Sequence, residues 1–141
     1  SLFHGFFFFF IENDKITRRL NLPIPKKNNS LSLGDHLLNS GHHGISLSGD
    51  DKTICVAGTM DGYIAIVDRE TFNYSIIKLS DDPKEAKPYW ATSSKDGKKA
   101  YVSISGLDKV SILDYVTGKV IGEVPVGNHP QRVRNGQLRL R

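Results

Sequence analysis

The chain repeats itself at a fixed spacing, and this feature limits most narrowly what it can fold into. When residues 44–73 are written above residues 90–119, an offset of 46, the two segments align without a gap. A period of this length is typical of repeat architectures, in which each repeat is one supersecondary unit that packs on its neighbours. The identical pairs are Ser48/Ser94, Asp50/Asp96, Lys52/Lys98, Val56/Val102, Ile66/Ile112, Asp68/Asp114 and Thr71/Thr117.

Each repeat predicts four short strands separated by turns. The third strand of each copy is rich in β-branched residues, and Gly-Asp or Asp-Gly dipeptides supply the backbone conformations that hairpin turns need. Four antiparallel strands in about 46 residues form the blade of a β-propeller. The predicted fold is therefore all-β, a partial β-propeller of antiparallel four-stranded blades. The expected strands are 43–47, 53–58, 63–68 and 75–79 in the first copy, and 89–93, 99–104, 109–114 and 119–124 in the second.

The flanks continue the pattern, so the 141 residues are expected to form a single partial propeller domain with two full blades and parts of two more. Phe6–Phe10 corresponds to a buried third strand and Ile16–Leu22 to a fourth strand and the residues just after it, with one helical turn expected at Asp35–Leu38. Propellers usually close with four to eight blades, so we expect an open wedge with apolar sides that self-associates or is marginally soluble. The expected parts are an incomplete blade at 1–22, a connecting loop at 23–41, blades at 42–87 and 88–128, and at 129–141 the first strand of a further blade or a closing strand.

Charge and hydropathy exclude several classes of protein. The net charge of +4 is accounted for by four arginines of the last ten residues, which leaves residues 1–131 formally neutral and predicts no nucleic-acid partner. The apolar run at 6–11 is about half the roughly 20 residues that a spanning helix needs, so no transmembrane segment is expected. It lacks a basic region before it and a cleavage site after it, although a truncated secretion signal stays open. A single cysteine rules out an intrachain disulfide.

Three segments resemble a known repeat. Residues 94–103, 109–120 and 124–130 are similar to the YVTN-type β-propeller repeat, with Tyr101-Val102-Ser103-Ile104 in place of its Tyr-Val-Thr-Asn motif. The resemblance covers about 42–134 well and 6–22 loosely. It implies a propeller, related to WD-like blades, at an extracytoplasmic location (periplasmic, secreted or cell surface). It also implies a fragment of a larger ring that serves in binding or as a scaffold.

The candidate binding residues lie at the start of the first strand of each repeat. The expected ligand-contacting side chains, facing the propeller axis, are His43, Tyr89, Trp90 and Arg132. His42, His43 and His129 are candidate metal ligands, but adjacent residues of a strand point to opposite faces, so one site can receive only one of the first two. Structural or solvated histidines are the alternative that the residues leave open.

The turns carry residues to which we assign a structural role: Asp68, Asp114, Asp96 and Gly97. A short acid at a strand end can accept hydrogen bonds from the backbone of its own turn, and recurrence in both blades favours structure over catalysis. We predict no catalytic residue, because no complete catalytic constellation or nucleotide-binding motif occurs.

The sequence therefore favours a non-catalytic scaffold or binding module. Its expected partners are a protein or small-molecule ligand at the propeller face, and either the remaining blades of the same protein or a second copy. The cofactor is unknown, and the fold requires none. The alternative, implied by the resemblance, is the propeller subunit or domain of a redox enzyme, like quinoprotein amine dehydrogenases or the haem- and metal-binding nitrite reductases.

Overall fold

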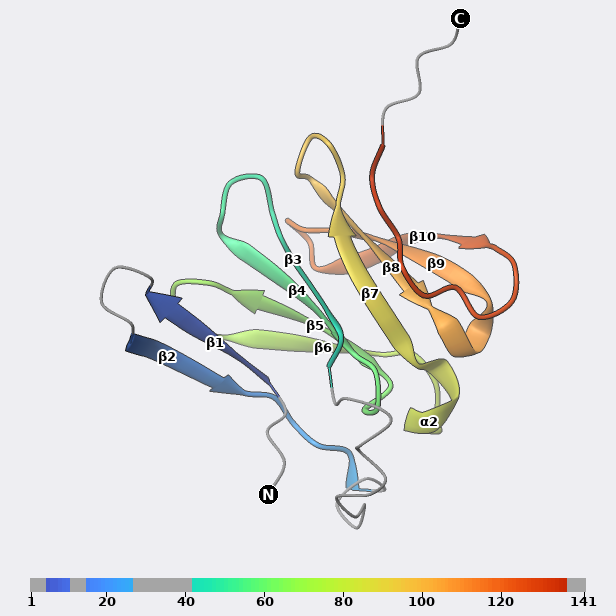
Figure 1. Ribbon diagram of the computed structural model, residues 1–141, viewed down its shortest axis with the longest axis horizontal. Helices are drawn as coiled ribbons and strands as arrows, with labels where there is room; N and C mark the ends of the chain where they lie inside the picture. Colours follow the sequence, from blue (N-terminus) through green and yellow to red (C-terminus); the bar gives the residue numbers. More distant parts are fainter. Residues whose placement is uncertain (1–4, 11–14, 27–41, 137–141) are drawn as a thin grey trace, which may run out of the picture.

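The computed structural model describes residues 5–10, 15–26 and 42–136, and they form three antiparallel sheets (Figure 1). This is the predicted all-β fold, a partial β-propeller. The elements are β1 (Gly5–Phe10), β2 (Lys15–Asn21), β3 (Gly44–Leu47), β4 (Thr53–Gly58), β5 (Tyr63–Asp68), β6 (Tyr74–Lys78), α2 (Pro83–Ala86), β7 (Pro88–Ser93), β8 (Lys99–Ile104), the 3-10 turn η3 (Ser105–Leu107), β9 (Lys109–Asp114) and β10 (Lys119–Pro125).

Two of the sheets are complete blades. Blade 1 is the sheet β3-β4-β5-β6 and blade 2 is the sheet β7-β8-β9-β10, each with its strands in sequence order. The second and third strands of both blades begin and end at the predicted residues; β3, β7 and β10 each deviate by one residue at one end, and β6 is displaced by one residue at both ends. The innermost strands β3 and β7 lie against each other, so the two sheets meet at a seam near the propeller axis.

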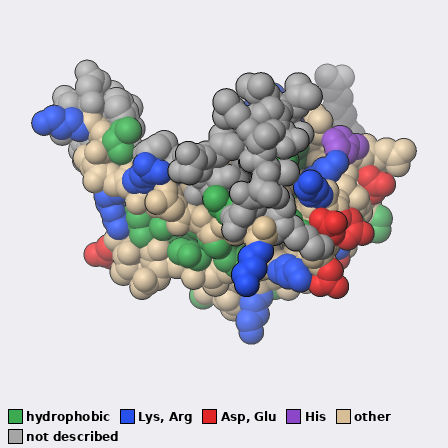
Figure 2. Space-filling view, turned by 90° about the horizontal axis from the view of Figure 1, so that it is seen from below, with side chains coloured by type: hydrophobic (Ala, Val, Ile, Leu, Met, Phe, Trp, Pro, Cys, Tyr) green, Lys and Arg blue, Asp and Glu red, His purple; other side chains and the backbone are tan. Residues whose placement is uncertain are grey.

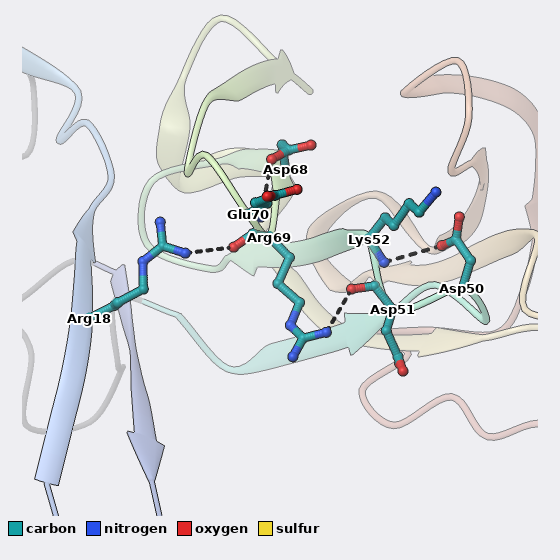
Figure 3. Close-up of a pocket in the computed structure, with 7 residues that line it drawn as sticks. All are labelled: Arg18, Asp50, Asp51, Lys52, Asp68, Arg69 and Glu70. Carbon is teal, nitrogen blue, oxygen red and sulfur yellow. Dashed lines mark hydrogen bonds between the residues drawn. The ribbon is translucent and has the colours of Figure 1, made fainter.

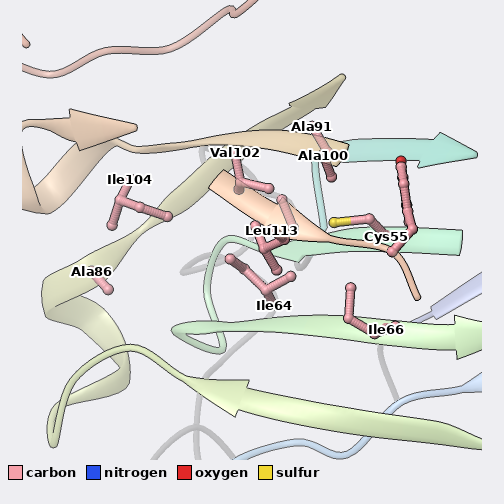
Figure 4. Packing of buried hydrophobic residues seen from close by; sticks show 11 residues of the cluster. Cys55, Ile64, Ile66, Ala86, Ala91, Ala100, Val102, Ile104 and Leu113 are labelled. Atoms are coloured by element: carbon pink, nitrogen blue, oxygen red, sulfur yellow. The ribbon is translucent and has the colours of Figure 1, made fainter. Parts of the chain in front are cut away.

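The seam between the blades is filled by alternate residues of the central strands, as the two-residue period of a strand requires. Cys55 and Ala57 of β4, with Ile64 and Ile66 of β5, face the aliphatic side chains of β8 and β9 (Figure 4). The blade 2 members of this core are Ala91, Ala100, Val102, Ile104, Leu113 and Tyr115, and Ala86 of α2 joins them.

Tyr115 connects the blades by hydrogen bonds as well as by packing. Its hydroxyl lies 2.8 Å from the hydroxyls of both Ser46 and Ser93, which belong to the two innermost strands. Ser93 also donates to the carbonyl of Leu47 at 2.6 Å. The tyrosine is buried and burial raises its pKa, so the hydroxyl stays protonated and holds the blades in one register.

The opposite face of blade 1 is covered by the N-terminal hairpin. The other set of alternate residues, among them Val56 and Ala65, forms a second core with Leu22, and Phe6 and Leu20 pack against it. β1 and β2 pair in an antiparallel two-stranded sheet with an irregularity after Phe8. The phenylalanine run is therefore a strand, as predicted, although the side chains of residues 7–10 lie outside the described part of the structure.

Two elements differ from expectation. Residues 131–134 do not form a strand, although the first strand of a further blade or a closing strand was predicted within 129–141, because no described strand pairs with this segment. The connection at 80–87 contains the short helix α2, which the sequence analysis missed; Asp82 caps it by accepting from the Lys84 amide at 3.0 Å, and Pro83 occupies its first turn. The expected helical turn at 35–38 lies outside the described residues. Among those that are described, no helix has the length and apolar character to cross a membrane.

The recurrent aspartates are held by their own turns. Asp68 accepts from the backbone amides of Glu70 and Thr71 at 3.1 and 2.7 Å, and Asp114 accepts from the amide of Thr117 at 2.7 Å. These backbone donors hold the pKa of both carboxyls below the ordinary value. Asp96 accepts from the Ser94 hydroxyl at 2.6 Å, which lowers its pKa in the same way, and the following Gly97 has a φ of +67°.

These carboxylates predict how stability depends on pH. A group with a depressed folded pKa stabilises the fold above its unfolded pKa, and that contribution is lost as pH falls through the folded pKa. We expect the free energy of unfolding to fall on acidification below an ordinary aspartate pKa of about 3.9. The double variant Asp68→Asn and Asp114→Asn should show a shallower fall, measured by urea denaturation at pH values from 7 to about 3. Parallel curves for the two proteins would contradict this assignment.

Candidate functional site

The candidate site lies at the end of the blades where β3 and β7 begin. The β4–β5 loop, α2 and η3 are at this same end, which is the lower part of Figure 1. His43 directly precedes β3, and Tyr89 is the second residue of β7. Their rings stack across the seam with centroids 4.3 Å apart and an interplanar angle of 18°. The structure thus brings two of the four predicted ligand residues together.

Hydrogen bonds fix the tautomer of His43. The Thr59 hydroxyl donates to the carbonyl of Pro88 at 2.7 Å, so its single hydrogen is already used. The oxygen of Thr59 therefore accepts from His43 Nδ1, which lies 3.0 Å away. Burial lowers the pKa of His43, so the ring is neutral at pH 7 and Nε2 carries a lone pair.

His42 points the other way and is part of the packing of blade 1. Its Nε2 lies 3.2 Å from the Tyr63 hydroxyl and 3.9 Å from the buried carboxylate of Asp61. Because the Tyr63 hydroxyl donates to the carbonyl of Pro23 at 3.0 Å, it accepts from His42. The two adjacent histidines thus lie on opposite sides of the strand, and only His43 faces the seam with blade 2.

Trp90 and Arg132 form the second aromatic contact of this end. The guanidinium carbon of Arg132 lies 4.9 Å from the centroid of the Trp90 ring, within the range of a cation–π interaction. Arg132 is exposed, and its planar donors can still reach a ligand. Figure 2 views this end of the molecule and shows Lys and Arg beside Asp and Glu, with both signs of charge present on the described surface.

The candidate metal ligands do not converge. His129 is exposed, has a φ of +51°, and its backbone amide donates to the Asp108 carboxylate at 2.8 Å. Within residues 5–10, 15–26 and 42–136, no group of three or more His, Cys, Asp or Glu side chains could hold a metal ion. Cys55 is fully buried, and burial raises the pKa of its thiol to about 12, so it is not a nucleophile.

The sequence analysis missed two hydroxyls that shape this end. Thr59 anchors the start of β7 through Pro88, and Ser105 donates in the same way to the carbonyl of Pro130. The two hydroxyls are 46 residues apart, which is the repeat offset. Comparison of small polar residues at that offset could have identified them, although their acceptors are backbone atoms that no sequence pattern marks.

The opposite end of blade 1 holds a pocket of about 380 Å³ (Figure 3). Both of its arginines donate hydrogen bonds to backbone carbonyls of the turns. Arg69 Nη1 donates to the carbonyl of Asp51 at 3.1 Å, and Arg18 Nη1 donates to the carbonyl of Arg69 at 3.0 Å. These bonds connect β2 to the turns of blade 1, so we assign the pocket a structural role.

No family model matches the chain, and no curated protein matches it. Among solved structures, hydrazine synthase from Kuenenia stuttgartiensis is similar with a TM-score of 0.67 and 17% identity, over 89% of this chain and 31% of that one. The chain has a partial β-propeller fold. Apo AztD from Citrobacter koseri (18% identity, 64% and 25% of the chains) and streptogramin B lyase (22%, 62% and 27%) also match, each with a TM-score of 0.49.

The propeller chain spans about a third or less of the length of these solved structures. At such low identity, the likeness to hydrazine synthase shows the fold alone. The redox-subunit alternative therefore stays a prediction from the sequence resemblance.

Proposed function

We propose that these two blades are a non-catalytic binding module of a larger propeller, and that a protein or small-molecule ligand contacts the end where β3 and β7 begin. The proposal rests on one observation: the fold holds the His43 ring in a fixed orientation. Its Nδ1 is used by Thr59, its ring is stacked on Tyr89, and it is half-buried, so the fold holds the ring in one orientation. Its other ring nitrogen, Nε2, is an acceptor that a ligand can use.

The chemistry of the neighbours indicates what such a ligand carries. A neutral imidazole nitrogen accepts a hydrogen bond from a hydroxyl, amide or ammonium group. Arg132 offers charge-assisted donors to a carboxylate or other anion, and the Tyr89 and Trp90 rings offer aromatic surface. A peptide with both donor and acidic groups fits this combination. The YVTN-type motif at residues 94–103 supports an extracytoplasmic binding role as part of the same proposal.

The proposal is tested by selecting binders from a random peptide library displayed on phage, using the immobilised protein. We expect the selected peptides to lose about tenfold in affinity on the His43→Phe variant, because one hydrogen bond that is partly shielded from water is worth roughly 1 kcal/mol or more. The measurement is titration calorimetry with the synthetic peptides.

The control is Val116→Ser, which changes a residue that is 90% exposed in the turn after β9, away from this end. The selected peptides should bind this variant with the same affinity as the wild type. Peptides that bind His43→Phe as tightly as the wild type would show that this end is not the binding surface.

A further inference from the structure

Phe72, in the turn between β5 and β6, has a backbone conformation that a phenylalanine rarely adopts. Its φ is +63°, in the left-handed region, where the Cβ atom of an L-residue comes too close to the following carbonyl oxygen. Glycine avoids this cost, and a bulky residue with such a φ is a genuine outlier in folded proteins. Contacts of the Phe72 side chain must therefore offset the strain, because the turn by itself favours glycine.

The corresponding turn of blade 2 has the glycine. Gly118 comes 46 residues after Phe72, and its φ is +64°. The Phe72 amide donates to the carbonyl of Asp68 at 2.9 Å, and the Gly118 amide makes the corresponding bond to the carbonyl of Asp114 at the same distance. The two turns thus share one backbone conformation, and only blade 1 places a large side chain at the left-handed position.

The ring of Phe72 contacts both strands of the N-terminal hairpin. The guanidinium carbon of Arg18, on β2, lies 3.6 Å from the centroid of the Phe72 ring, which is a close cation–π contact. The ring of Phe6, on β1, meets the Phe72 ring edge-on, with centroids 5.7 Å apart and an interplanar angle of 66°. A glycine at position 72 would remove both contacts.

Arg18 is held over this ring by a second contact with the same turn. Its Nη1 donates to the carbonyl of Arg69 at 3.0 Å (Figure 3). A planar guanidinium can donate from its edge while its face stacks on an aromatic ring. Elsewhere β2 offers little to blade 1: Leu20 is half-buried and packs on the second core, whereas the other six residues of the strand are exposed. The turn at Phe72 is therefore a specific attachment point of the hairpin.

We propose that Phe72 is the docking residue for the hairpin β1–β2, and that the hairpin and the left-handed turn form one cooperative unit. The ring contacts offset the backbone strain as long as the hairpin is docked. When the hairpin leaves, the strain is no longer offset, so the turn changes conformation. The hairpin is then a strap over the second core of blade 1, against which Phe6 and Leu20 pack. This inference does not involve His43, so it stands or fails separately from the binding role.

Hydrogen exchange of the backbone amides, followed by NMR, tests the docking. We expect the amides of β1 and β2 to exchange about tenfold faster in Arg18→Ala and in Phe72→Leu than in the wild type, because an undocked two-stranded hairpin is only marginally stable. The amides of β8 and β9 in blade 2 should be unaffected. The double variant should exchange no faster than either single variant, because both changes remove the same contact.

The matched control is Arg19→Ala, on the next residue of β2. The Arg19 Nε atom donates to Asn21 Oδ1 at 3.0 Å, within the same strand, so the hairpin amides should exchange as in the wild type. Unchanged hairpin exchange in Arg18→Ala and Phe72→Leu would overturn the proposal, and so would an equal increase in Arg19→Ala. A double variant that exchanges about a hundredfold faster would show that the two side chains act independently.

A second comparison tests the strain. Phe72→Gly and Phe72→Leu both lose the ring, but only glycine relieves the left-handed backbone. We expect the amides of residues 69–73 to exchange about tenfold more slowly in Phe72→Gly than in Phe72→Leu. Gly118→Leu should accelerate exchange in the turn of blade 2 by about the same factor, because no ring contact offsets the strain there. Equal exchange in the two Phe72 variants would overturn the cooperative unit.

A third measurement needs no variant. In the wild type, the side-chain protons of Arg18 lie over the face of the Phe72 ring, so we expect their NMR resonances to be shifted upfield by the ring current. Resonances of Arg18 at the positions found in an unfolded chain would show that the hairpin is not docked on Phe72, and would overturn the proposal.

Discussion

Replacement of Ile64 by alanine is expected to lower the free energy of unfolding by about 2–5 kcal/mol. Ile64 is fully buried at the centre of the seam, between the blade 1 strands and the blade 2 core around Leu113. Its removal leaves a cavity that both sheets line, and two sheets held by hydrogen-bonded strands can collapse only partly into it. Urea denaturation followed by circular dichroism measures the change.

The matched control is Ile121→Ala, the same substitution on β10, where the side chain is 53% exposed. We expect a loss below about 1 kcal/mol there, as for other surface positions. Equal losses at the two positions would mean that the blades do not pack through this core.

Gly44→Ala is expected to destabilise the chain by about 1–3 kcal/mol or more, although it adds only a methyl group. A Cβ at position 44 would lie 2.4 Å from the nitrogen of Ala91 and 2.6 Å from the Cα of Trp90. Both are backbone atoms of β7, so relief requires that β3 and β7 move apart. We expect a lower thermal midpoint and, by NMR, altered shifts for His43 and Tyr89, whose stacking depends on that distance.

Gly122→Ala on β10 provides the comparison, because its added Cβ would meet only the Cδ1 atom of Ile112, at an ordinary 3.7 Å. That variant should be neutral or slightly stabilised, by up to about 1 kcal/mol, since alanine restricts the unfolded chain. A Gly44→Ala protein as stable as Gly122→Ala would show that the innermost strands are not in close contact.

The strands could be predicted because their signals are local and occur twice. The second and third strands of both blades are short runs of mostly apolar residues between turns rich in Gly and Asp, and the structure has them at the predicted residues. The segment at 131–134 shows the limit of this reasoning. Its residues alternate as in a strand, but a strand forms only where a neighbouring strand supplies hydrogen-bond partners, and no described strand does so.

The candidate site was predictable only in part. Position in the repeat placed His43 and Tyr89 at the entrances of successive innermost strands, and the structure stacks their rings. The role of Thr59, which fixes the ring of His43, depends on the carbonyl of Pro88 from the next blade. Such a contact joins residues that are far apart in sequence, and only the packing of one blade on the other creates it.

The sequence by itself determined the repeat and its strands, because these follow from the short apolar, β-branched runs of each copy and from turn chemistry. Only the tertiary structure decided which of the two adjacent histidines faces the seam. It also decided that the backbones of the two blades come so close at Gly44 that a side chain there would push them apart. It also decided that a hydroxyl anchor recurs at Pro130. These features depend on distances between separate blades, which the order of residues along one strand does not specify.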